Sequence, residues 1–93
     1  VKTVKMSAST GNTLVELLEF AEPVGSNIIR KVNDIGASHV AFTVSDLEET
    51  YLRLKQLGVK FNAPPQLSPD GYAKVTFCFD PDKTPIELVQ VLK

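Results

Sequence analysis

Three ionisable side chains that bind metals in other proteins stand within short, otherwise apolar runs of the sequence. Glu87 and Glu16 each stand between two aliphatic residues, and His39 is followed by Val40-Ala41-Phe42 in a strand-like pattern. An ionisable group buried in a strand is unfavourable unless a hydrogen bond, an opposite charge or a metal ion compensates it. A single divalent cation shared by the three would compensate all of them, and this is the hypothesis that the sequence raises.

One imidazole and two carboxylates on separate strands make a borderline-to-hard ligand set with coordination positions left open. Such a set suits Zn, Ni, Co, Mn or Fe(II) and differs from a closed structural zinc site. Open positions allow a small substrate to chelate the ion through two neighbouring oxygens. The ion then acts as a Lewis acid or, if it is iron, as an oxygen-activating centre.

The residues alone leave structural interpretations open beside this one. A single histidine in a strand, such as His39, is more often a hydrogen-bonded structural residue than a ligand. Glu87 follows a Thr-Pro turn and is compatible with a solvated face, and Glu16 is equally compatible with either role. Because side chains alternate along a strand, Glu19 lies on the face opposite Glu16, and we expect it to face solvent.

Composition limits the classes of function. The chain has 93 residues, 43% of them apolar and 23% charged, which indicates one small globular domain. A formal charge of −1 argues against nucleic acid or an anionic membrane as a partner, and no run is long enough for a membrane helix. The single Cys78 forms no internal disulfide, so we expect a cytoplasmic protein. The chain opens at Val1 directly in a strand pattern, and we expect an N-terminal portion before it.

The pattern predicts an α+β fold in one domain, with strands at 1–8 and 13–20, a linker at 21–35 and a complete βαβββ module at 36–93. The first two strands are joined by a Gly/Asn turn and form a hairpin. Leu-Val-Glu-Leu in the hairpin echoes Ile-Glu-Leu-Val near the end of the chain. The hairpin therefore reads as the last two strands of a second module of the same kind.

The complete module has clear local signals. Ser45 and Glu48 match a capping box, and Gly58 ends the helix. We expect Lys74 and Thr76 to be exposed, Cys78 partly buried and Tyr51 in the helix core, while Phe42 and Tyr72 suit either a cup lining or packing. The remaining elements are predicted as strands at 40–44, 59–61, 73–79 and 86–92, a loop at 63–71 and a turn at 80–83.

The sequence resembles the vicinal oxygen chelate superfamily, also called the glyoxalase/bleomycin-resistance/dioxygenase fold. The matching stretches cover most of the chain and read NDIGASHVAFTVSDLEETYLRLKQLGV, FCFDPDKTPIELVQ and GNTLVELLEFAEPVG. The resemblance implies a mixed sheet curled into a cup with a metal at its base. It implies His39 and Glu87 as first-strand and last-strand ligands of the complete module, Glu16 as the last-strand ligand of the partial one, and a fourth position outside this sequence.

One turn departs from the family pattern. The family's DPDGN appears here as Asp80-Pro81-Asp82-Lys83-Thr84. The turn thereby loses a glycine suited to a left-handed conformation. We expect this difference to affect the turn and not the ligands.

The resemblance favours a metal-dependent lyase or isomerase of the glyoxalase type that acts on a small oxygenated substrate. Glu16 or Glu87 would be the catalytic base, since a ligand carboxylate moves protons in such members. Alternatives are an extradiol-type dioxygenase, a metal-free antibiotic-sequestering protein of the same fold, or an inactive fragment. Open sheet edges of a single module must be covered, so we expect a homodimer, one form of which exchanges modules between the chains.

Overall fold

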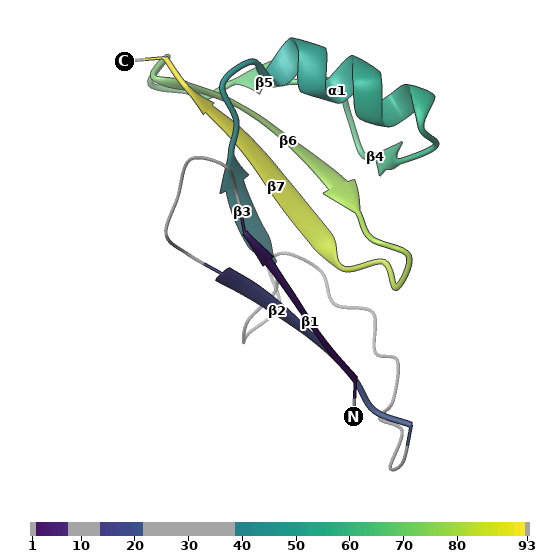
Figure 1. The fold of residues 1–93 in the computed structure, drawn as a ribbon. Helices are drawn as coiled ribbons and strands as arrows, with labels where there is room; N and C mark the ends of the chain where they lie inside the picture. Colours follow the sequence, from purple (N-terminus) through teal and green to yellow (C-terminus); the bar gives the residue numbers. More distant parts are fainter. Residues whose placement is uncertain (1, 8–13, 22–38, 93) are drawn as a thin grey trace.

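The computed structural model describes residues 2–7, 14–21 and 39–92. The turn expected at 9–12 and nearly all of the linker expected at 21–35 lie outside these residues. The described elements, in chain order, are β1 (Lys2–Ser7), β2 (Leu14–Glu19), β3 (Val40–Thr43), α1 (Leu47–Gln56), β4 (Lys60–Phe61), β5 (Gln66–Leu67), β6 (Ala73–Phe79) and β7 (Pro85–Val91) (Figure 1).

The strands form two separate sheets. In the main sheet the order is β3-β7-β6-β4, and β5 also pairs with β6. β3 runs parallel to β7 while the other pairs are antiparallel, so the sheet is mixed as predicted. β1 and β2 pair antiparallel as a two-stranded sheet of their own. The α+β class and the order of elements are thus confirmed, although the described strands do not close into a barrel or a cup.

Helix α1 packs on one face of the main sheet and creates the core. Leu47 of the helix is fully buried, and it clusters with Cys78 of β6 and Leu88 of β7. Burial raises the pKa of the Cys78 thiol above its ordinary value, so the thiol stays protonated at neutral pH. The partly buried residues packed against this cluster are Phe42, Val44, Leu54, Val59, Phe61 and Ile86.

The burial of Thr76 corrects the expectation that it is exposed. Thr76 shares the helix-facing side of β6 with Cys78 and is 4% exposed. Its hydroxyl donates a hydrogen bond to the carbonyl oxygen of Ala63 at 2.7 Å, which satisfies the buried polar group. Alternation along the sequence shows which residues of β6 share a face, but tertiary packing decides which of the two faces meets the helix.

The start of α1 lies one residue later than the capping box predicts. Asp46, not Ser45, is the N-cap, and its carboxylate accepts a hydrogen bond from the backbone N–H of Glu49 at 3.2 Å. Both residue types are good caps, and Asp46 has the extended backbone that the position requires (φ −140°, ψ 99°). The carboxylate of Glu48 instead lies 3.7 Å from the ammonium group of Lys74. The other end agrees with the prediction, since Gly58 follows the helix with φ +93°.

The predicted loop at 63–71 contains the short strand β5, which corrects that assignment. Gln66 and Leu67 pair with Val75 and Lys74 of β6. The surrounding proline-rich sequence carries no strand signal, and only the neighbouring strand provides the hydrogen-bond partners.

The turn between β6 and β7 places a lysine in the left-handed backbone region. Lys83 has φ +67°. The turn is held by the carboxylate of Asp80, which accepts hydrogen bonds from the N–H groups of Asp82 at 2.9 Å and Thr84 at 2.7 Å. A residue with a Cβ is unfavourable by about 1–2 kcal/mol in this conformation, whereas glycine adopts it without strain.

We therefore expect Lys83→Gly to stabilise the chain, even though glycine also increases the entropy of the unfolded state. The net increase in the free energy of unfolding should be about 0.5–1 kcal/mol, measured by urea denaturation. Lys83→Ala is the matched control, because it removes the same charge and keeps the Cβ. Equal stability changes in the two variants would show that the left-handed backbone is not the cause.

Candidate functional site

The structure brings His39 and Glu87 into direct contact. His39 immediately precedes β3, and Glu87 lies in β7 opposite Ala41 in the parallel pairing. Because side chains alternate along a strand, His39 and Ala41 lie on the same face as Glu87. Nε2 of His39 lies 3.0 Å from Oε1 of Glu87, within hydrogen-bonding distance. Pairing of β3 with β7 thus unites two residues that are far apart in the sequence.

The pair lies on the face of the main sheet opposite α1. The neighbouring residues Ile86 and Leu88 pack toward the helix, so Glu87 between them points to the other side. The side chain of His39 is 29% exposed and that of Glu87 is 23% exposed. The two groups are therefore partly desolvated but remain reachable by a small ligand.

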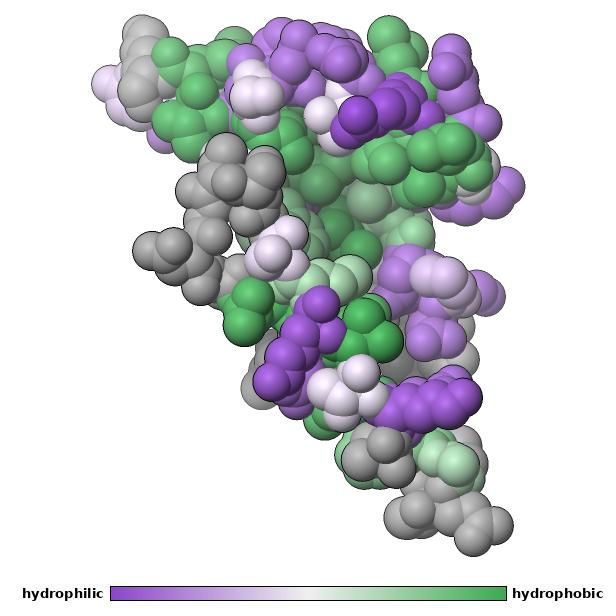
Figure 2. Space-filling view, viewed as in Figure 1, coloured by the Kyte–Doolittle hydropathy of each residue, from purple (hydrophilic) through white to green (hydrophobic). Residues whose placement is uncertain are grey.

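Aromatic and aliphatic side chains surround the pair on this face. Phe77 of β6 lies opposite Glu87, and its ring meets the imidazole of His39 edge-on, with centroids 5.2 Å apart and planes at 69°. Val75 and Val89 are cross-strand partners in the next position on the same face. Apolar surface is visible over the main sheet as well as on the hairpin (Figure 2). The pair thus stands on a mainly apolar surface that would contact the apolar part of a ligand.

The spacing of the two donor atoms fits a shared cation. Nitrogen and oxygen ligands bound at about 2.0–2.2 Å to one ion lie about 2.8–3.6 Å apart when their angle at the ion is about 90–109°. The observed 3.0 Å between Nε2 and Oε1 falls in this interval. The donor types, imidazole and carboxylate, also suit the transition metals expected from the sequence. His39 and Glu87 therefore fit two neighbouring coordination positions.

Glu16 is not part of this pair in the described chain. It lies in β2, exposed and opposite Lys5 of β1 in the separate two-stranded sheet. Within the residues that the structure describes, no three or more His, Cys, Asp or Glu side chains gather closely enough to hold a metal ion. Glu19 lies on the other face of β2, exposed, with its carboxylate 3.9 Å from the ammonium group of Lys2. The structure thus unites two of the three expected ligands.

The fold agrees with comparisons against known proteins. A sequence model of the Glyoxalase/Bleomycin resistance protein/Dioxygenase superfamily matches residues 2–88. The chain belongs to this superfamily. The glyoxalase-like chain is also 31% identical over 80 residues to the uncharacterized protein YwkD of Bacillus subtilis (strain 168). That alignment covers 86% of the chain and 60% of YwkD, so the chain spans less than two thirds of this relative.

Solved structures of superfamily members show the same fold. The glyoxalase family protein APC24694 from Bacillus cereus matches with a TM-score of 0.81 and 22% identity, over 98% of this chain and 62% of the other. The genomically encoded fosfomycin resistance protein FosX from Listeria monocytogenes matches with a TM-score of 0.52 and 22% identity, over 70% of this chain and 52% of the other. At these identities the likeness concerns the fold of this superfamily member and not its activity.

Some residues around the His39–Glu87 pair were not predicted from the sequence. Phe77 borders the pair, and only its cross-strand position opposite Glu87 shows this. Phe42, left open between cup lining and packing, packs in the core, while Tyr72 is 54% exposed. In the described residues no helix is long and apolar enough to cross a membrane.

Proposed function

We propose that the chain provides His39 and Glu87 to a divalent-metal site of a glyoxalase-type lyase or isomerase. The observation that carries this proposal is the 3.0 Å separation of their donor atoms on the apolar, helix-free face of the main sheet. The superfamily assignment supports it, because the two residues occupy the positions that the sequence resemblance implies for ligands.

Each residue of the pair has a distinct part in this proposal. A bound divalent cation would polarise two neighbouring oxygens of a small substrate as a Lewis acid. Glu87 provides a carboxylate oxygen that takes a proton from carbon next to the polarised oxygen and returns it to a neighbouring position. His39 would hold the ion through Nε2, in place of the 3.0 Å contact that this nitrogen makes with Glu87 in the chain without metal. The ring of Phe77 limits the access of water to His39 and Glu87.

Glu16 is proposed as a third ligand, supplied by a second copy of the chain in a homodimer. Its hairpin presents apolar side chains to solvent on the face that carries Glu16, since Leu14 is 60% and Leu18 51% exposed. Exposed apolar surface of this kind is typical of an interaction site, and pairing with a second copy would cover it. Such pairing would also bring a second carboxylate, that of Glu16 from β2, to the His39–Glu87 pair.

Metal titration of the purified, chelator-treated chain tests this proposal. We expect one Zn²⁺ or Ni²⁺ per His39–Glu87 pair by calorimetry, and dimers by sedimentation. Glu16→Gln should weaken binding by about tenfold or more, because an anionic ligand is replaced by a neutral amide. Glu19→Gln is the matched control on the same strand and should bind as the unmodified chain does.

Two outcomes of this titration would contradict separate parts of the proposal. Equal affinities of Glu16→Gln and Glu19→Gln would remove Glu16 from the ligand set and leave the other two in place. Failure of the unmodified chain to bind any of Zn²⁺, Ni²⁺, Co²⁺, Mn²⁺ or Fe²⁺ would overturn the metal-dependent function.

Metal-free binding of a small molecule is the second candidate function. The observation in its favour is that His39 and Glu87 satisfy each other at 3.0 Å without an ion, beside Phe77 and other apolar residues. The structural likeness to a fosfomycin resistance protein is consistent with antibiotic recognition by a protein of this fold. Binding of an antibiotic that is unaffected by a chelator would support this function. Ring cleavage of a catechol in the presence of Fe²⁺ would instead support a dioxygenase.

A further inference from the structure

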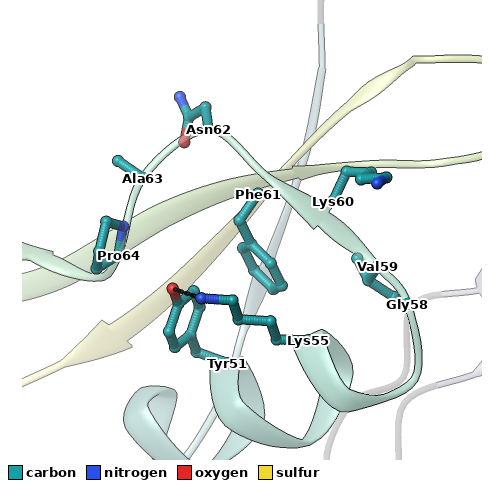
Figure 3. Close-up of a pocket in the computed structure, with 9 residues that line it drawn as sticks. All are labelled: Tyr51, Lys55, Gly58, Val59, Lys60, Phe61, Asn62, Ala63 and Pro64. Carbon is teal, nitrogen blue, oxygen red and sulfur yellow. Dashed lines mark hydrogen bonds between the residues drawn. The ribbon is translucent and has the colours of Figure 1, made fainter.

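A cavity lies on the helix side of the main sheet, on the face opposite the His39–Glu87 pair. It opens between α1 and the chain segment that follows it, and it has a volume of about 460 Å³ (Figure 3). Cavities that bind small organic molecules usually measure about 300–1,000 Å³. The proposed metal site uses none of the residues that line it.

One part of the cavity is aromatic. Tyr51 of α1 and Phe61 of β4 pack edge to face, with ring centroids 4.7 Å apart and planes at 71°. Tyr51 is only 8% exposed, so its ring is held firmly. Pro64 lines the same space (Figure 3). These rings offer a rigid apolar surface against which a planar group can pack.

The polar part of the cavity favours an anion. The ammonium group of Lys55 donates a hydrogen bond to the phenol oxygen of Tyr51 at 3.3 Å and lies 5.4 Å from the centre of its ring. An ammonium group has three donors, so this bond leaves donors for a ligand. None of the described residues that line the cavity is acidic, so no carboxylate there repels an anion. Figure 3 shows Lys55 reaching to Tyr51, whereas Lys60 and Asn62 point away from the rings.

Hydrogen bonds to β6 and α1 fix the segment that faces the helix. The backbone N–H of Asn62 donates to the carbonyl oxygen of Phe77 at 3.1 Å, and Ala63 accepts from the hydroxyl of Thr76 at 2.7 Å. At the other end, the N–H of Val59 donates to the carbonyl oxygen of Leu54 at 3.0 Å. Both walls are therefore in place before a ligand arrives, which reduces the entropy lost on binding.

We infer that this cavity binds a small carboxylic acid with an aromatic body. The carboxylate accepts charge-assisted hydrogen bonds from the Lys55 ammonium group and the Tyr51 hydroxyl, while the ring packs against Phe61 and Pro64. This site is independent of the proposed metal site, because the two lie on opposite faces of the sheet.

Titration with benzoate, followed residue by residue by NMR, tests the inference. We expect saturable shifts at Tyr51, Lys55 and Phe61, with no comparable shifts at His39. Lys55→Met keeps the apolar stem and removes the charge, and should weaken benzoate binding about tenfold. Tyr51→Phe keeps the ring and should weaken it about threefold. Lys60→Met, which makes the same charge change in a side chain that points away from the rings, should stay within about twofold.

The controls distinguish specific binding of benzoate in the cavity from nonspecific attraction of an anion to lysine side chains. Benzamide, the neutral analogue, should bind at least about tenfold more weakly than benzoate, since it lacks the charge that Lys55 recognises. An unchanged backbone spectrum away from the cavity shows that each variant is folded. Equal losses in Lys55→Met and Lys60→Met, shifts centred on His39, or no saturable shifts would each overturn the inference. None of these outcomes depends on whether the chain binds a metal.

Discussion

Replacing His39 by alanine is expected to weaken the binding of Zn²⁺ or Ni²⁺ by about a hundredfold or more. Loss of a group that merely orients a ligand already costs about 10–100-fold in metal affinity, and His39 is proposed to be a ligand itself. Glu87→Gln should have an effect of similar size, because it keeps the shape of the side chain and removes the charged oxygen that lies 3.0 Å from Nε2. Calorimetric titration of the chelator-treated variants measures both effects.

Thr43→Ala is the matched control for His39→Ala. Thr43 lies on β3, exposed, and alternation places it on the same face as His39. Its removal should leave metal affinity unchanged while altering the same surface. If His39→Ala retained the affinity of the unmodified chain, the histidine would be a structural partner of Glu87 and no ligand.

A thermal measurement distinguishes the ligand role from the structural one. A ligand that binds only the folded chain stabilises it by RT ln(1 + [L]/Kd), so an ion at a hundred times its Kd adds about 2.7 kcal/mol. The unmodified chain should therefore melt at a higher temperature with Zn²⁺ than without it. The His39→Ala and Glu87→Gln variants should lose that shift. A purely structural hydrogen bond would lower the melting temperature equally with and without the ion.

The order of elements could be predicted because the local signals along the chain are strong. Alternation of apolar residues predicts β6 at 73–79, which matches its observed bounds Ala73–Phe79. Helical spacing and the glycine after the last turn likewise predict α1, with Gly58 at φ +93°. Each of these features depends on neighbours in the sequence, so the sequence alone suffices to find it.

The errors share a different cause, since each concerns a choice that tertiary contacts decide. Ser45 and Asp46 are both good helix caps, and the N–H of Leu47 donates to Oε1 of Gln90 in β7 at 2.8 Å, which fixes where the helix begins. Thr76 is buried because α1 packs on its side of β6. The aromatic cavity beside Lys55 was not predicted for the same reason, as its residues meet only when the segment after the helix pairs with β6.

Prediction of the His39–Glu87 contact required information about long-range strand pairing as well. His39 and Glu87 become neighbours only through the parallel pairing of β3 with β7. No local pattern predicts which strands pair in parallel, so their contact was expected from the family resemblance and not from spacing. The role of Glu16 stays a prediction. Glu16 lies on the separate sheet of β1 and β2, and the hydrogen bonds within the two sheets do not determine where a second chain binds.

Leu47→Ala is expected to destabilise the chain by about 3 kcal/mol. Leu47 is fully buried, and truncation of a buried leucine leaves a cavity that costs about 2–5 kcal/mol. The effect is large for this chain, because among the described residues only Leu47, Tyr51, Cys78 and Leu88 are buried hydrophobics. Small domains have total stabilities of only about 5–15 kcal/mol. Urea denaturation measures the loss, and Leu52→Ala, at a position 57% exposed on the same helix, should change stability by less than about 0.5 kcal/mol.

The Leu47→Ala variant also tests whether the two faces of the main sheet act independently. Leu88 meets Leu47 on the helix side of β7, while its neighbour Glu87 points to the opposite side. If β7 remains in the sheet, the folded fraction of Leu47→Ala should bind metal with the affinity of the unmodified chain, although that fraction is smaller. Loss of affinity in a fully folded sample would mean that the position of β7 depends on helix packing. The His39–Glu87 spacing would then be set by the core and not by strand pairing alone.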